Sequence, residues 1–316
     1  MKDNAMNTDN DFLIKKLKES DYSDEQINLI IKGLLEEKLT TFRINNIKCN
    51  NKEKLLQVFK DLGLKYSACK SINDAYIFDN YKVKDGFDSK TGLKFDKFAF
   101  YQNGEIYVQS LSSMLPVLVL DPEKKENILD MCAAPGGKTT MICSVCNNKV
   151  NLTAVEIHKD RFDKLNYNLK KQGANAITFN MNAIDLDDMF KFDKILLDAP
   201  CSGSGTLDIS NNRYKKVFTE ELINKCVKTQ KKLIKKSYKL LKSGGVLIYS
   251  TCSLLKEENE NIVDYALENG YKIDFCKIKN DKKDYSFGSS VNDNVYIKIF
   301  PDKYWEGFFI AKLIKT

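Results

Sequence analysis

Histidine is almost absent from this chain of 316 residues, in which His158 is the only one. Sites built on paired histidines, whether for zinc or for proton relay, are therefore nearly excluded, and carboxylates, thiols or solvent must act as general bases. No apolar run reaches the roughly 18 residues that a bilayer span needs. The polar N-terminus also lacks the apolar segment of a secretion signal. We therefore expect a cytoplasmic protein with no membrane or metal partner.

Cysteine is plentiful by contrast, with nine residues, of which three lie in short loops that carry motifs. An odd number of cysteines in a chain without a secretion signal argues against a disulfide framework, so we expect reduced thiols. The excess of basic residues is mild, 50 against 43 acidic ones. A net charge of +7 is compatible with a polyanionic partner but does not establish one.

The first hundred residues mix helix and strand patterns, which predicts a small α+β module over residues 1–104. The expected elements are two amphipathic helices within 10–39, a strand at 40–45, a helix at 52–62 and short strands at 75–78 and 105–108. No internal repeat or low-complexity linker separates this module from the remainder of the chain.

From about residue 109 strands and helices alternate, which predicts a parallel or mostly parallel sheet with helices on both faces over 105–316. We expect strands at 127–131, 151–156, 176–180, 193–198 and 245–251, helices at 137–147, 160–172, 219–242 and 257–269, and a last strand, possibly antiparallel, within 305–314. Open sheets of this kind bind ligands beyond the carboxyl ends of their strands. The three motif loops all fall at such ends.

The first motif loop places Gly136 and Gly137 after a predicted strand and at the start of a helix. Missing Cβ atoms allow close approach to a ligand, and the helix N-terminus offers free N–H groups. Glu156 stands nineteen residues after Gly137, where an acidic residue accepts from ribose hydroxyls. The turn is not G-x-G-x-x-G, and Lys138 suits a carboxylate as well as a phosphate, which favours S-adenosylmethionine over NAD. The alternative is a structural turn with an incidental acid downstream.

The other two loops each contain a cysteine at the end of a predicted strand, Cys201 in a Pro-Cys-Ser-Gly context and Cys252 in a Thr-Cys-Ser context. A thiolate that adds to C6 of a pyrimidine makes C5 nucleophilic enough to accept a methyl group. Asp198, three residues before Cys201, is placed to supply the proton that N3 needs. A second thiol can then remove the C5 proton. Taken singly each cysteine favours buried packing, but the two matched contexts together favour catalysis.

These loops resemble the motifs of the Fmu/Sun-type RNA cytosine-C5 methyltransferases in composition, order and spacing. The three segments are Asp130-Met131-Cys132-Ala133-Ala134-Pro135-Gly136-Gly137-Lys138-Thr139-Thr140, Asp198-Ala199-Pro200-Cys201-Ser202-Gly203-Ser204-Gly205 and Tyr249-Ser250-Thr251-Cys252-Ser253. Further agreement comes from Phe42-Arg43-Ile44-Asn45, from Tyr107-Val108-Gln109-Ser110-Leu111-Ser112-Ser113 and from Gly307-Phe308-Phe309-Ile310-Ala311. The resemblance covers about residues 40–316.

The resemblance implies a Rossmann-like S-adenosylmethionine-dependent methyltransferase domain preceded by an RNA-recognition-like module. It implies that Cys252 attacks C6 and that Cys201 assists release, while Asp198 faces both the base and the cofactor. The implied cofactor pocket comprises Cys132, Ala133, Ala134, Pro135, Gly136, Gly137, Lys138, Glu156, Asn182 and Asp198. Asn182 stands where the family often has Asp, and its amide oxygen can still accept from the adenine amino group.

The expected partner is RNA, contacted by Arg43 and, beside the chemistry, by Arg213, Lys215 and Lys216. The N-terminal elements are most similar to those of bacterial enzymes that modify 16S ribosomal RNA, so this RNA is the first expectation and transfer RNA the alternative. Those enzymes carry an additional C-terminal domain, which we expect to be absent here. We expect a monomer. A non-catalytic RNA-binding assembly factor and a small-molecule methyltransferase are the alternatives from other classes.

Overall fold

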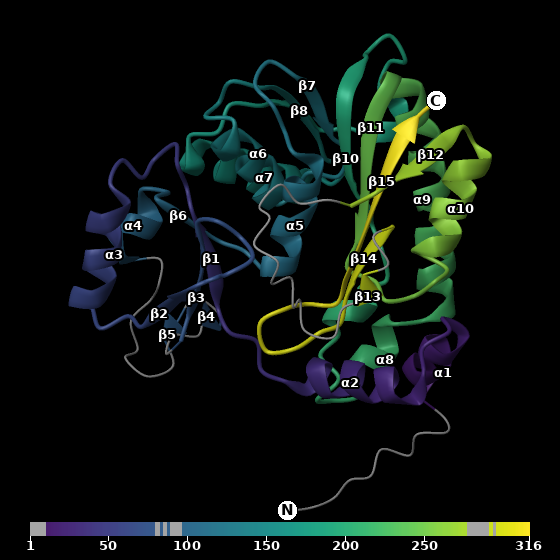
Figure 1. The fold of residues 1–316 in the computed structure, drawn as a ribbon, viewed down its shortest axis with the longest axis horizontal. Coiled ribbons are helices and arrows are strands. Elements are labelled where there is room, and N and C mark those ends of the chain that lie inside the picture. Colours follow the sequence, from purple (N-terminus) through teal and green to yellow (C-terminus); the bar gives the residue numbers. More distant parts are fainter. Residues whose placement is uncertain (1–10, 80–82, 85–86, 89–96, 277–290, 293–294) are drawn as a thin grey trace, which may run out of the picture.

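A computed structural model describes residues 11–79, 83–84, 87–88, 97–276, 291–292 and 295–316. Figure 1 shows a large twisted sheet on one side of the molecule and a small sheet on the other, with a helical hairpin below the large one. Within the part of the chain that is described, no helix has both the length and the apolar character needed to cross a bilayer.

The large sheet contains nine strands and is parallel at its centre. Its order is β13-β14-β15-β11-β10-β7-β8-β9, with β12 paired to β15. The pairs among β11, β10, β7, β8 and β9 are parallel, whereas β15 runs antiparallel to β11. The strands are β7 (Asn127–Asp130), β8 (Asn151–Val155), β9 (Ile177–Phe179), β10 (Phe192–Asp198), β11 (Leu241–Thr251), β12 (Tyr271–Asp274), β13 (Val291–Asn292), β14 (Tyr296–Ile299) and β15 (Phe308–Lys315).

Helices cover both faces of this sheet (Figure 1). Successive strand residues point to opposite faces, so Leu196 packs in the core beneath α5 and α6, and Leu197 packs beneath α9 and α10. The helices on the two faces are α5 (Leu111–Leu120), α6 (Gly137–Val145), α7 (Lys159–Gln172), α9 (Glu220–Leu240) and α10 (Glu260–Glu268). The structure thus confirms the predicted fold class.

The small sheet is antiparallel, with the order β2-β3-β1-β6, and an aromatic core holds it to one helix. Phe42 is fully buried and its ring stacks on Phe78 at 4.3 Å and meets Phe59 edge-on at 5.5 Å. The elements of this region are β1 (Thr41–Ile44), α3 (Lys52–Asp61), β2 (Tyr66–Ala68), β3 (Ala75–Phe78), β4 (Val83–Lys84), β5 (Phe87–Asp88), α4 (Ala99–Gln102) and β6 (Ile106–Val108).

Helices α1 (Phe12–Glu19) and α2 (Asp24–Leu35) pack against the large sheet's domain rather than against the small sheet. Leu17 and Ile30 are fully buried in a cluster with residues such as Leu255, which follows β11. Gly33 allows α2 to approach closely, because a Cβ atom there would lie 1.6 Å from the Pro301 carbonyl oxygen. The boundary at 104/105 remains a prediction, and the small sheet draws its last strand, β6, from just beyond it.

The predicted elements of the large domain match the structure to within a few residues, and the last strand, whose direction was left open, is antiparallel. Helix α5 was not predicted. It is apolar on nearly every side and contains Pro116, so it shows no amphipathic period, and eight of its ten residues are buried. The short connecting elements η3 (Ala183–Asp185), η4 (Ser204–Thr206) and α8 (Tyr214–Val217) complete the domain.

Replacing Phe42 by Ala should lower the free energy of unfolding by about 3–5 kcal/mol, because it opens a cavity at the centre of the aromatic core. Urea unfolding followed by circular dichroism measures the change. Leu62→Ala, at a site 47% exposed at the end of α3, is the control and should stay within about 0.5 kcal/mol of wild type. Equal losses in the two variants would contradict the assignment of the core.

Candidate active site

The loop between β7 and α6 forms a backbone cradle at the carboxyl edge of the sheet. Gly136 has a φ of +102°, which favours glycine, and a Cβ atom there would lie 3.0 Å from Leu165 Cδ1. Its N–H donates to the Ala133 carbonyl, and the Ala133 N–H donates to Val155 of β8. Arg161 on α7 donates to the Ala134 carbonyl at 2.7 Å. The loop is therefore fixed on both sides, as a ligand-binding turn requires.

Three carboxylates surround the Cys132 thiol in this loop. Burial, followed by the charges of Asp130, Asp198 and Glu156, raises the pKa of Cys132. Glu156 is buried and accepts from the His158 N–H at 2.9 Å. Asp130 accepts from the Thr139 hydroxyl through Oδ2, and its Oδ1 has no partner among the described residues although it is buried. The pocket thus offers acceptors for cationic and hydroxyl groups.

Lys138 and Asp198 join the first loop to the second. The Lys138 ammonium lies 2.7 Å from Asp198 Oδ2 and 2.8 Å from the hydroxyl of Ser113 on α5. The other oxygen of Asp198 accepts from the Ser250 hydroxyl at 2.8 Å. Asp198 retains partial exposure while Lys138 is buried. Each carboxylate oxygen therefore has a donor, and the carboxylate is held at the mouth of the cradle.

The two motif thiols lie in contact. Cys201 follows β10, Cys252 follows β11, and their sulfur atoms are 3.2 Å apart. Backbone bonds hold the two loops together, since the Gly205 N–H donates to the Cys252 carbonyl at 2.9 Å. A hydrogen bond between the Ser204 and Ser253 hydroxyls at 3.0 Å adds to this link. Both cysteine residues are partly exposed.

The surroundings of Cys201 act on the ionisation of its thiol. Its hydrogen bond with the Cys252 sulfur, its burial and the charge of Glu258 together raise the pKa of Cys201 well above its usual range. This environment favours the thiol form of Cys201, and either sulfur can be the donor in the hydrogen bond between the two cysteines. None of the nine cysteines, all of which are described, forms a disulfide.

The sequence model of the family described as 16S rRNA methyltransferase RsmB/F matches residues 117–314, more than half of the chain. The chain belongs to this family. A Pyrococcus horikoshii protein named tRNA (cytosine(72)-C(5))-methyltransferase is 37% identical over 220 residues, which are 68% of this chain and 54% of that protein. The ribosomal RNA small subunit methyltransferase F of Vibrio campbellii is 35% identical over 224 residues, 69% of this chain and 46% of that protein. The chain spans about half the length of these curated relatives.

Solved structures match nearly the whole chain. NSun6 from Pyrococcus horikoshii, solved with SFG, has a TM-score of 0.78 and 27% identity, and the match covers 95% of this chain and 97% of that one. A structure titled PH0851 has a TM-score of 0.80 and 25% identity over 96% of this chain and 68% of that one. The likeness therefore extends over the small sheet and the helical hairpin as well as the region that the family model matches.

Arg43, which we expected to contact RNA, lies inside the protein. It is 3% exposed, and its guanidinium donates to Gln109 Oε1, to Thr140 Oγ1 and to the Gly137 carbonyl. It also lies over the Tyr107 ring at 5.0 Å. The structure therefore assigns Arg43 to the link between the small sheet and the start of α6, and gives no support to an RNA contact.

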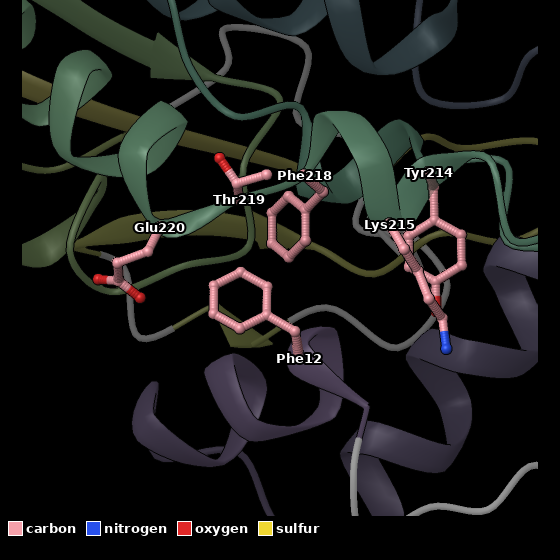
Figure 2. Close-up of a pocket in the computed structure, with 6 residues that line it drawn as sticks. All are labelled: Phe12, Tyr214, Lys215, Phe218, Thr219 and Glu220. Carbon is pink, nitrogen blue, oxygen red and sulfur yellow. The ribbon is translucent and has the colours of Figure 1, made fainter.

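The other predicted RNA residues, Arg213, Lys215 and Lys216, are exposed on and before α8. Lys215 lines a pocket with Phe12 of α1 and Phe218 (Figure 2). The thiols do not line this pocket, and Lys215 already pairs with Asp11 at 3.1 Å. The RNA role of these residues remains a prediction.

Asn182 lies after β9, where its side-chain oxygen accepts from the Ile184 N–H at 3.1 Å. One lone pair of that oxygen is thus used in capping a short helix, and its proposed cofactor contact remains a prediction.

Sequence reasoning did not assign Asp130, Ser113, Ser250 or Glu258 to the site. Asp130 and Ser250 stand inside the quoted motifs at strand ends, so their position could have identified them. Glu258 carries no such signal.

Asp130 provides a test of the site's electrostatics, because burial raises its pKa to about 7 from about 3.9 in the unfolded chain. The folded protein then holds a proton that the unfolded chain releases, so stability falls as pH rises from about 4 to about 7, by at most about 1.4 kcal/mol per unit. Asp130→Asn removes this dependence. Urea unfolding from pH 4 to 8 should show wild type losing stability relative to the variant up to about pH 7 and not above. Parallel curves would contradict the buried carboxylate.

Proposed function

We propose that this protein transfers a methyl group from S-adenosylmethionine to C5 of cytosine in RNA. The observation that carries the proposal is the contact of Cys201 with Cys252 at 3.2 Å, beside the Lys138–Asp198 pair. Two thiols, an acid–base pair and a cofactor cradle at one sheet edge are the groups that this chemistry needs. Family membership and the names of the relatives support the same reaction.

The cradle residues fit S-adenosylmethionine, which would supply the methyl group from its sulfonium. The unpartnered Asp130 Oδ1 is an acceptor for an ammonium group, and Glu156 at the end of β8 suits ribose hydroxyls. The N-terminus of α6 offers backbone donors for a carboxylate. NSun6, solved with the S-adenosylmethionine analogue SFG, supports this assignment.

Cys252 is the nucleophile of the proposed reaction. Its thiolate attacks C6, and the electron pair of the C5–C6 double bond moves through the ring as N3 gains a proton. The Lys138–Asp198 pair supplies that proton, since its two groups are 2.7 Å apart at the mouth of the cradle. The protonated Cys201 stabilises the attacking sulfur by hydrogen bonding until the carbon–sulfur bond forms. C5 is then electron-rich and takes up the methyl group.

Cys201 completes the reaction as the base. Once the Cys252 sulfur is a thioether, it carries no charge and no longer holds the Cys201 proton, so the largest influence that raises the Cys201 pKa is removed. Cys201 loses its proton to solvent and takes the proton from C5. The C6–sulfur bond breaks, Cys252 leaves as a thiolate, and N3 returns its proton to the Lys138–Asp198 pair. The base must be unpaired or flipped out for both thiols to reach it.

For the target we retain 16S ribosomal RNA, in line with the description of the family and with the Vibrio relative. The archaeal relative is named for transfer RNA, which makes this the alternative. Bisulfite sequencing of total RNA from cells with and without the protein distinguishes them, because the target cytosine loses its protection in the deletion strain. If no cytosine changes, the proposed function is wrong.

We further propose a cytoplasmic monomer that uses residues 1–104 as its RNA-binding module and 105–316 for catalysis.

Replacing Cys252 by Ala should reduce methyl transfer by more than about 1,000-fold, because the covalent step is lost. Transfer of radiolabelled methyl groups to RNA measures the rate, and calorimetry should show cofactor affinity within about twofold of wild type, as expected for a residue that acts only on the base. Cys49→Ala, in the small sheet's region, is the matched control and should retain activity. Normal turnover by the Cys252 variant would assign the nucleophile elsewhere.

Replacing Cys201 by Ala should allow attack and slow release, because the base that removes the C5 proton is missing. An RNA–protein adduct should accumulate and survive on a denaturing gel. The double variant C201A/C252A is the control and should form no adduct. Absence of the adduct with C201A alone would show that the release role is wrong.

A further inference from the structure

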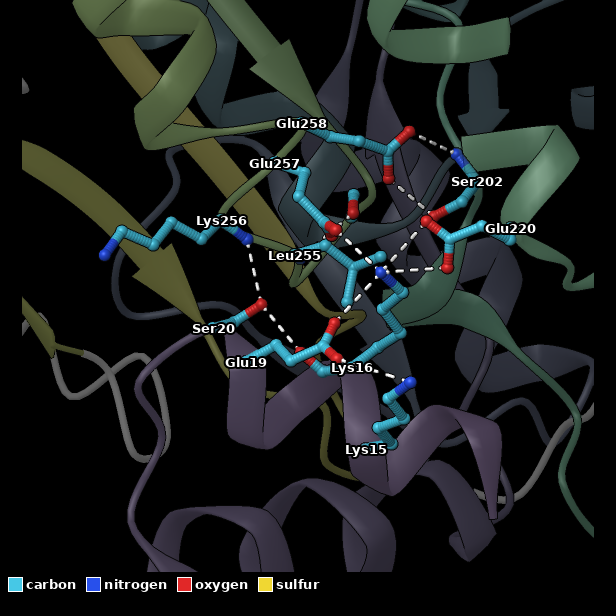
Figure 3. Close-up of polar contacts among 11 residues, drawn as sticks. Lys15, Lys16, Glu19, Ser20, Ser202, Glu220, Leu255, Lys256, Glu257 and Glu258 are labelled. Carbon is cyan, nitrogen blue, oxygen red and sulfur yellow. Dashed lines mark hydrogen bonds and ion pairs between the residues drawn. The ribbon is translucent and has the colours of Figure 1, made fainter. Parts of the chain in front are cut away.

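Glu258 is a buried carboxylate outside the three sequence motifs, and it is hydrogen-bonded to the Cys201 loop. It is fully buried and accepts from the Ser202 N–H at 2.8 Å and from the Ser202 hydroxyl at 2.6 Å. Figure 3 shows the carboxylate pointing directly at Ser202. Gln230 of α9 donates to Glu258 at 3.4 Å and to the Pro200 carbonyl at 2.9 Å. Ser202, which follows Cys201, is thus hydrogen-bonded to Glu258 directly, and Pro200, which precedes it, is linked to Glu258 through Gln230.

The same short segment also fixes the Cys252 loop. Asn259 accepts from the Thr251 hydroxyl at 2.6 Å and donates to the Ser253 carbonyl at 2.9 Å. Tyr249 of β11 donates to the Glu258 carbonyl at 2.5 Å. Residues 258–259 therefore contact the neighbours of both cysteines, although they belong to neither motif.

The N-terminal helix α1 fixes this segment from outside. The Lys16 ammonium, on a side chain that is nearly buried, lies 2.7 Å from Glu257 and 3.0 Å from Glu220 (Figure 3). The Lys256 N–H donates to the Ser20 hydroxyl at 3.0 Å. The turn that presents Glu258 is consequently anchored on α1, on α9 and on both thiol loops.

We propose that Glu258 is a positioning residue that sets the Cys201 loop against the Cys252 loop, so that Cys201 reaches C5 of a base bonded to Cys252. A buried carboxylate is costly unless it is fully hydrogen-bonded, and this one directs both of its shortest bonds to a residue adjacent to Cys201. The inference rests on the proposed function, and it assigns Glu258 to the release step in particular. Attack needs only the hydrogen bond between the two sulfur atoms, whereas release needs the Cys201 sulfur to reach C5, so we expect the loss of Glu258 to slow release more than attack.

The test compares Glu258→Ala and Glu258→Gln with wild type in formation and breakdown of the RNA adduct. The probes are unmodified 16S ribosomal RNA and transfer RNA transcripts, with S-adenosylmethionine and quenching into denaturing gels. Glu258→Ala should form the adduct within about threefold of the wild-type rate and break it down at least about tenfold more slowly, whereas Glu258→Gln, which keeps an acceptor for the Ser202 N–H, should recover most of the loss. Glu268→Gln removes the same charge at an exposed site at the end of α10, and breakdown should be unchanged.

A pH profile separates positioning from a merely structural role. The titratable groups that interact with Glu258 or Cys201 are Cys252, Tyr249 and Cys226. The charge of Glu258 raises the pKa of Cys201, so in Glu258→Gln the rise of the breakdown rate with pH should shift to lower pH. An unshifted profile, or equal losses in formation and breakdown, would overturn the inference.

Two further arms keep the outcomes distinct. The unfolding curve shows whether Glu258→Ala folds. If it does not fold, Ser202→Ala takes its place, because it removes only the hydrogen bond from the Ser202 hydroxyl to Glu258, and it should slow breakdown of the adduct by a smaller factor. Normal breakdown in the Ser202 variant overturns the inference. If C201A traps the adduct while the Glu258 variants release it normally, the inference fails and the proposed function stands. If C201A traps nothing, the release role fails, and the role of Glu258 fails with it.

Discussion

Strands β10 and β11 lie side by side and parallel in the large sheet, with Asp198 opposite Ser250. The two loops that follow must therefore begin at the same edge, and a cysteine three residues beyond one partner meets a cysteine two residues beyond the other. The Ser250 hydroxyl donates a hydrogen bond to Asp198, which joins the carboxyl ends of β10 and β11. Because β7 also pairs parallel with β10, the cofactor loop begins at this edge too. The placement of the two thiols and of the Asp198 carboxylate depends on that register.

Most of the large sheet could be predicted, because its strands and helices differ in period and are separated by polar turns. Helix α5 could not, since an apolar run carries no period that distinguishes a buried helix from a buried strand. The small strand β12 was missed for a different reason. Its residues Tyr271–Asp274 alternate over only four positions, and only its pairing with β15 makes it a strand. Long-range pairing of this kind is not present in local sequence.

Motifs in the sequence indicated which loops meet at the sheet edge, but they did not indicate the pairs that residues of distant segments form there. The cysteines could be identified from their contexts, but the Lys138–Asp198 pair joins residues 60 positions apart. Arg43 shows the converse error. A cationic residue in a motif suggested an RNA contact. Arg43, however, stands in a strand whose four residues are all buried. Its guanidinium donates hydrogen bonds to Gln109, Thr140 and Gly137 in place of water. Charge indicates a surface role only when the strand leaves one face exposed.

The order of elements along the chain also differs from their order in space. Helices α1 and α2 precede the small sheet in sequence but pack on the domain of the large sheet, where Tyr22 donates to the Leu254 carbonyl and Lys16 pairs with Glu257. The small sheet instead meets the start of α6 through Arg43. Each N-terminal segment thus stabilises a different loop: the helical hairpin supports the turn after Cys252, and the small sheet supports the cofactor cradle. Both N-terminal segments are therefore bonded to loops at the carboxyl edge of the large sheet, so a contact that displaces either segment acts on the loop that it supports.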